Sequence, residues 1–119
     1  MKIILDTNFV MDAIRFKVDI FSELSGNSLF VLDTIEKELE SIEKKGTNES
    51  KLAKIALQFL KTKGLKALKS IEKNTDASLL AYSQINYAIA THDSLLRNLI
   101  RKKGGKVLYI RQRSYVVIE

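Results

Sequence analysis

The chain has 119 residues, 45% of them hydrophobic, which is enough for one domain with a buried core and too little for two. It contains no cysteine, so disulfide bonds and thiolate metal sites are excluded. Lys and Arg number 20 against 14 Asp and Glu, and the net charge of +6 favours a polyanion as a partner. No apolar run reaches the roughly 20 residues of a membrane span, and the first residues do not form a signal peptide, so we expect a cytoplasmic protein without a membrane partner.

The first third of the chain alternates apolar runs with helical segments. Lys2–Asp6 is a short apolar run that ends in an acid, which is typical of a buried strand, and Ser28–Asp33 repeats this pattern. Between them we expect helices over Thr7–Phe16 and Asp19–Leu24. The pattern predicts two strands that each deliver a carboxylate at their carboxyl ends.

Two further helices are expected in the middle of the chain. The first begins at a cap on Asp33 or Thr34, where Asp33 and Glu36 resemble a capping box, and it ends near Lys45. The second, Thr47–Lys63, has apolar residues at positions i, i+3, i+4, i+7 and i+8, and a glycine follows it. Both helices therefore have one face that packs on a core.

The remainder of the chain continues the alternation of strands and helices. In order, we expect a strand at 65–71, a helix from Asn74 or Thr75 to Ser83, a strand at 87–91, a helix at 92–103, and strands at 106–110 and 115–118. Strands that alternate with helices form parallel sheets covered on both faces. The sequence therefore predicts an α/β fold, with residues 1–119 as a single domain.

Four acids stand apart from the others by their position. Asp6 ends the first strand, and Asp93 follows the predicted strand at 87–91, so both are expected at the carboxyl edge of the sheet, where sites form in open parallel sheets. Glu38 lies on the apolar face of its helix, and Asp76 begins the apolar face of the next one. A carboxylate on such a face is costly unless something pairs with it, and neighbouring carboxylates raise each other's pKa values. Mg²⁺ or Mn²⁺ would resolve this, because both prefer oxygen ligands.

A plainer interpretation of these acids stays open. Asp6, Asp76 and Asp93 could each be a first-turn acid that stabilises a helix dipole, although Glu38 fits this poorly because it lies a turn inside its helix. The remaining candidates have ordinary explanations: we expect Asp33 to be a cap, Asp12 and Asp19 to be surface acids, and His92 to help start its helix rather than bind a metal.

The four acids occur in short motifs whose order and spacing resemble those of PIN domains, a family of ribonucleases. The motifs are Asp6-Thr7-Asn8, Glu38-Leu39, Asp76-Ala77 and Ala90-Thr91-His92-Asp93. The segments 16–21, 53–57, 97–103 and 107–110 look like those of archaeal PIN proteins, which are similar to the eukaryotic endonuclease that processes small-subunit ribosomal RNA and are often grouped with VapC toxins. One departure is Asp33-Thr34, where relatives often carry Ser-Pro; it affects the helix cap and not the acids.

The resemblance implies a three-layer α/β/α fold with a central, mostly parallel sheet, and endonucleolytic cleavage of RNA with Mg²⁺ or Mn²⁺. It further implies a homodimer, and an antitoxin protein as a partner if the chain is a toxin; we expect no small-molecule organic cofactor. In this hypothesis the metal and catalytic residues are Asp6, Glu38, Asp76 and Asp93, the residues that orient them are Thr7, Asn8 and Thr91, and the residues that contact RNA are Arg97, Arg101, Lys102 and Lys103.

Rival functions are less consistent with the sequence. A haloacid-dehalogenase phosphohydrolase needs a second acid two residues after the first, where this chain has Asn8. A phosphoacceptor receiver domain needs an early pair of acids, which is missing. The serious alternative is a catalytically weak RNA-binding or ribosome-assembly factor that retains the PIN fold, and Mn²⁺-dependent cleavage of RNA would separate it from an enzyme.

Overall fold

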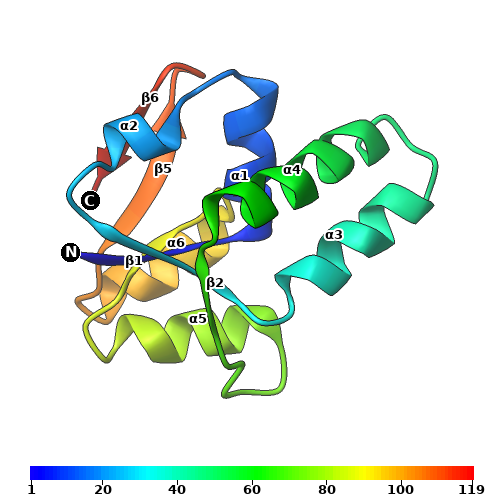
Figure 1. Cartoon of the computed structure of the whole chain (residues 1–119). Coiled ribbons are helices and arrows are strands. Elements are labelled where there is room, and N and C mark those ends of the chain that lie inside the picture. The colour runs from blue at the N-terminus through cyan, green and yellow to red at the C-terminus, as the bar shows by residue number, and fades with distance from the viewer.

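The computed structural model describes all residues from Met1 to Glu119 and places a six-stranded sheet at the centre (Figure 1). The strands are β1 (Lys2–Leu5), β2 (Ser28–Leu32), β3 (Lys66–Leu68), β4 (Ala88–Ala90), β5 (Val107–Arg111) and β6 (Tyr115–Ile118). Their order across the sheet is β3-β2-β1-β4-β5-β6, and all neighbours are parallel except β5 and β6, which are antiparallel. The predicted, mostly parallel sheet is confirmed.

Helices cover both faces of the sheet. They are α1 (Thr7–Arg15), α2 (Ile20–Glu23), α3 (Ile35–Lys44), α4 (Ser50–Lys63), α5 (Thr75–Ser83) and α6 (Ser94–Lys102). Side chains alternate along β1, so Ile3 and Leu5 pack with α1 to α4 on one face, whereas Ile4 packs with α5 and α6 on the other. This is the predicted three-layer α/β/α arrangement. None of the helices is both long enough and apolar enough to cross a membrane.

The order in which strands are added to the sheet reverses between β1 and β4. The strands β2 and β3 follow β1 on one side of it, whereas β4 and β5 lie on its other side. The backbone N–H of Asp6 donates to the carbonyl of Ala90 at 2.9 Å, and that of Thr91 donates to the carbonyl of Leu108 at 3.0 Å. In an open parallel sheet, the carboxyl ends of two such strands border a crevice. Asp6 and Thr91 are therefore neighbours although 85 residues separate them.

The structure corrects the predicted cap at Asp33. The N-cap of α3 is Thr34, which makes no side-chain capping bond. The Asp33 carboxylate instead accepts hydrogen bonds from the backbone N–H and the hydroxyl of Ser70, at 3.1 and 2.7 Å. This happens because β3 pairs with β2 and brings the following loop beside Asp33, whose N–H donates to the carbonyl of Leu68 at 2.8 Å. A contact distant in sequence thus replaces the local one.

Gly105 lies where the turn after α6 packs against the helix. A Cβ atom at this position would lie 2.7 Å from Cγ2 of Ile100, a fully buried side chain that cannot move away. We expect Gly105→Ala to lower the free energy of unfolding by about 1–3 kcal/mol, because overpacking a rigid core is costly. Urea denaturation would measure this change, and an unaltered midpoint would contradict the packing described.

Candidate active site

Asp6 is a buried carboxylate at the end of β1 and the N-cap residue of α1. One of its oxygens accepts a hydrogen bond from the backbone N–H of Thr7 at 2.8 Å. The other accepts one from the hydroxyl of Thr91, also at 2.8 Å. Two neutral donors, one from α1 and one from the end of β4, therefore fix the orientation of this side chain.

The pKa of Asp6 is raised from 3.8 to about 6, and burial is the largest cause. The hydrogen bonds from Thr91 and Thr7 oppose this rise, because they stabilise the charged form. The negative charges of Glu38 and Asp76 add to the rise. Asp6 is thus destabilised as an anion both by its loss of water and by neighbours of the same sign.

Glu38 reaches the same region from α3. Its carboxylate accepts hydrogen bonds from the hydroxyls of Thr7 at 3.2 Å, Thr34 at 3.3 Å and Thr75 at 3.0 Å. A small void of about 10 Å³ is bordered by Asp6, Thr7, Glu38 and Thr75, and it has the size of roughly one water molecule. Asp6 and Glu38 therefore face a shared space and are linked through Thr7.

Asp76 and Asp93 come from the first turn of α5 and the N-cap of α6. One oxygen of Asp93 accepts hydrogen bonds from the N–H groups of Leu95 and Leu96 at 3.0 and 3.2 Å, which leaves the other oxygen free. The carboxylate of Asp76 has no hydrogen-bond partner, and its pKa is raised by partial desolvation, then by the charge of Asp93, then by that of Glu38. Both acids border a groove of about 340 Å³ whose other walls are mostly leucine.

No basic side chain neutralises these four acids. The ion pairs of the structure join Arg15 to Asp12 and Glu49, His92 to Asp12, and Arg101 to Glu119. The charges of these acids nevertheless act on one another. Glu38 and Asp76 contribute to the raised pKa of Asp6, and Asp93 and Glu38 contribute to the raised pKa of Asp76. No three acidic or histidine side chains are arranged to hold one metal ion as they stand. The donor set, made only of oxygen atoms and lacking a counter-charge, fits a hard divalent cation.

The three residues expected to orient the acids lie around Asp6. Thr7 bonds both Asp6 and Glu38, through its N–H and its hydroxyl, and the hydroxyl of Thr91 bonds Asp6. Asn8 acts differently from the expectation, because it contacts none of the acids directly. Its side-chain oxygen accepts from the N–H of His92 at 3.0 Å and lies 3.4 Å from the hydroxyl oxygen of Thr91, whose hydrogen is directed to Asp6.

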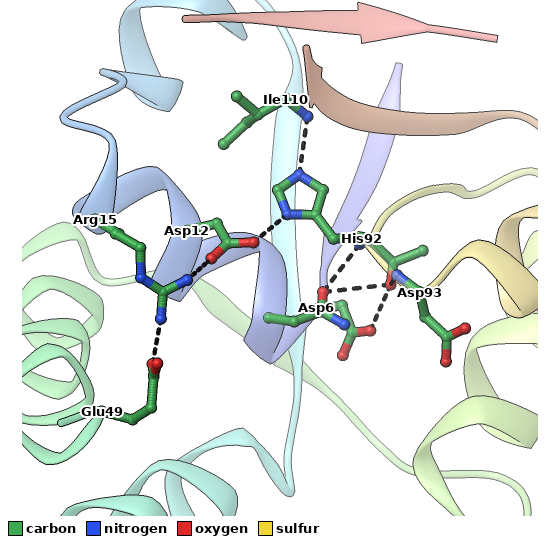
Figure 2. Close-up of polar contacts among 9 residues, drawn as sticks. Asp6, Asp12, Arg15, Glu49, His92, Asp93 and Ile110 are labelled. Carbon is green, nitrogen blue, oxygen red and sulfur yellow. Dashed lines mark hydrogen bonds and ion pairs between the residues drawn. The ribbon is translucent and has the colours of Figure 1, made fainter. Parts of the chain in front are cut away.

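His92 and Asp12 form a contact that the sequence did not reveal. Helix α6 begins at Ser94 with Asp93 as its cap, so the expectation that His92 starts this helix is wrong. The ring nitrogens of His92 lie 2.5 Å from the carboxylate of Asp12 and 2.9 Å from the backbone N of Ile110 (Figure 2). Asp12 is therefore a partly buried partner of His92 rather than a free surface acid. The one sequence signal for a paired role of Asp12 was its position three residues before Arg15 on the same helix.

Asp19 also has a more specific role than a surface acid. It is the N-cap of α2, and its carboxylate accepts from the N–H of Ser22 at 3.1 Å. The sequence carried the signal for this cap, an Asp immediately before an apolar helical residue.

The basic residues of α6 lie at different distances from the acids. Arg97 is one turn from the start of the helix and stacks over the ring of Tyr109 at 4.4 Å, and its Nε has no partner. Arg101 is paired with Glu119. Lys102 and Lys103 are exposed at the far end of the nine-residue helix, about 13 Å along its axis from Asp93. Of this group, Arg97 lies nearest to Asp93 along the helix.

The raised pKa of Asp6 has a consequence for stability. Between about pH 4 and pH 6 the folded state holds a proton on Asp6 that the unfolded state has lost, so the free energy of unfolding falls as pH rises through this window. We expect Asp6→Asn, which cannot ionise, to be more stable than the parent above about pH 6, by about 3 kcal/mol at most. The gain should vanish below about pH 4. Urea unfolding across this range in a chelator would measure it, and a parent more stable than the variant at pH 7.5 would contradict it.

Comparisons with known proteins agree with this fold. A family model described as a PIN like domain matches residues 3–113. The solved structure of the PIN domain endonuclease Utp24 superimposes with a TM-score of 0.78 and 26% identity, over 99% of this chain and 90% of that chain. A domain of a functionally unknown protein from Methanocaldococcus jannaschii DSM 2661 shares the fold, with a TM-score of 0.68 and 19% identity over 92% of this chain and 91% of that chain. No curated protein matches the sequence. Because the family model covers nearly the whole chain, this protein belongs to the PIN-like domain family and has the fold of a PIN-domain nuclease.

Proposed function

We propose that this protein is an endoribonuclease that hydrolyses phosphodiester bonds of RNA with Mg²⁺ or Mn²⁺. The observation that carries the proposal is that Asp6 and Asp76 have pKa values raised by the charges of neighbouring acids, among them Glu38 and Asp93, and that none of the four forms an ion pair. Such an arrangement is costly for a fold alone, and a divalent cation would remove the cost. The likeness to the endonuclease Utp24 supports the same activity class.

In this proposal Asp6, Asp76 and Asp93 hold the cation, directly or through water. Glu38 holds a second cation or orients the attacking water. A bound cation lowers the pKa of water and stabilises the charge that develops on the phosphate. The protein itself contributes orientation, because Thr7 and Thr91 fix the direction of the Asp6 oxygens. The expected products of cleavage carry a 5′-phosphate and a 3′-hydroxyl.

The proposed substrate is consistent with the charge of the chain. A net charge of +6 attracts a polyanion, whereas the acidic site itself repels one until a cation is bound. The same chemistry would serve either a nuclease that processes ribosomal RNA or a VapC-like toxin, for which an adjacent antitoxin gene would be the distinguishing observation. An assembly factor that binds RNA without cutting it is the alternative from another functional class.

Two substitutions on one helix test the catalytic proposal. We expect Glu38→Gln to lower the rate of Mn²⁺-dependent cleavage of a mixed RNA pool by roughly 100-fold, because it removes a charge from the site. Glu40→Gln changes an exposed acid of the same helix and should leave the rate unchanged. Asp6→Asn should abolish measurable cleavage. A parent that binds RNA but does not cleave it in Mn²⁺ would favour the assembly factor instead.

The basic end of α6 is tested by the dependence of RNA binding on salt. If Lys102 and Lys103 contact phosphates, replacing both by alanine should weaken binding and reduce the slope of log K against log salt by roughly 1.5, since each single-strand phosphate contact contributes about 0.7. The matched control replaces Lys44 and Lys45, two exposed lysines at the end of α3, and should leave the slope unchanged. Equal slopes for all three proteins would remove Lys102 and Lys103 from the RNA interface.

A further inference from the structure

The ring of His92 lies where α1, the loop after β4, and β5 meet (Figure 2). The backbone N–H of Ile110 donates to Nε2 at 2.9 Å, so this nitrogen carries a lone pair. The ring hydrogen then belongs on Nδ1, which donates to the carboxylate of Asp12 at 2.5 Å. The ring of Phe9 packs beside it, with the two centroids 5.4 Å apart. Both nitrogens are used, and the imidazole has one orientation.

The Asp12 carboxylate is itself held from the other side. Arg15, one turn later on α1, donates to it and pairs also with Glu49, the N-cap residue of α4 (Figure 2). A continuous series of polar contacts therefore runs from the start of α4, through α1, to the backbone of β5. His92 is the member of this series that belongs to the loop bearing the acidic site.

The loop of residues 91–93 connects His92 to two of the four acids. Thr91 donates its hydroxyl to Asp6 at 2.8 Å and accepts from the N–H of Asp93 at 3.2 Å. The N–H of His92 donates to Asn8 at 3.0 Å. The His92 ring anchors the middle residue of this loop. The direction of the Thr91 hydroxyl and the position of the Asp93 side chain therefore depend on His92.

We propose that His92 is a positioning residue of the metal site, and that with Asp12 it fixes the loop through which Thr91 orients Asp6 and from which Asp93 faces the groove that it borders with Asp76. This inference rests on the proposed function, because it assigns His92 to the cation that the four acids would hold. His92 binds no cation itself, since neither ring nitrogen is free. Outer partners that orient carboxylate ligands typically change metal affinity by 10–100-fold.

The test measures Mn²⁺ affinity of the folded protein, RNA cleavage and thermal stability in parallel. We expect His92→Phe, which keeps a ring but loses both hydrogen bonds, to weaken Mn²⁺ binding by roughly tenfold or more and to lower kcat at subsaturating Mn²⁺, with KM for RNA unchanged. Asp12→Ala should weaken Mn²⁺ binding similarly. The double variant should lose no more than the larger single loss, because both substitutions break one contact.

Two conservative variants separate the bonds of the ring. His92→Gln retains an acceptor near the Nε2 position, and His92→Asn retains a donor near the Nδ1 position; we expect each to restore part of the Mn²⁺ affinity that His92→Phe loses. They also keep the proposal testable if His92→Phe does not fold. Tyr82→Phe is the control for a purely structural loss, since it removes a 2.6 Å hydrogen bond to Lys69 on the other face of the sheet. It should lower stability and leave Mn²⁺ affinity unchanged.

The outcomes are distinguishable from failure of the proposed function. Folded His92 and Asp12 variants that bind Mn²⁺ as tightly as a parent that binds and cleaves would overturn the positioning role alone. A parent that neither binds Mn²⁺ nor cleaves RNA would overturn the proposed function and the positioning role with it. Losses that track the fall in stability, and that Tyr82→Phe reproduces, would identify His92 as a structural residue only.

Discussion

The site depends on one electrostatic constraint, the placing of the Asp6 carboxylate inside the protein with other carboxylates near it. The pKa of Asp6 is raised to about 6, first by burial and then by the charges of Glu38 and Asp76, against the opposing hydrogen bonds from Thr91 and Thr7. A fold selected for stability alone would pair such a group with lysine or arginine, or replace it by an apolar residue. This chain does neither, although it has 20 basic residues available. This uncompensated negative charge is the feature on which the proposed cation site rests.

The topology explains how residues so distant in sequence come together. Because β1 and β4 are adjacent and parallel, their carboxyl ends deliver Asp6 and Thr91 side by side. The helices that follow strands start at this same edge, so the amino-terminal ends of α3, α5 and α6 bring Glu38, Asp76 and Asp93. The site is thus a property of strand order, and small shifts within any one helix would move only one of its acids.

The sequence predicted the features that depend on local periodicity and strand ends. The strands, most helices and the parallel sheet followed from apolar runs that alternate with helical patterns, and Asp6 was placed by the strand that it ends. The failures are contacts between segments far apart. Asp33 looked like a cap but binds Ser70, 37 residues later, and Asp12 contacts His92 across 80 residues. Neither pair has a spacing that a helix or strand imposes, so only the folded chain reveals them.

The hydrogen bonds that hold Asp6 and Glu38 leave the negative charge of the acidic group without a positive partner. Thr7, Thr34 and Thr75 donate hydroxyls to Glu38, and Thr91 donates one to Asp6. A hydroxyl fixes a carboxylate in space without neutralising it, whereas an ammonium or guanidinium group would fix it and cancel its charge. The arginine and histidine of the neighbouring network are instead committed to Asp12, which lies outside the acidic group. Orientation and charge are thereby controlled by separate residues, and the negative potential remains available for a cation.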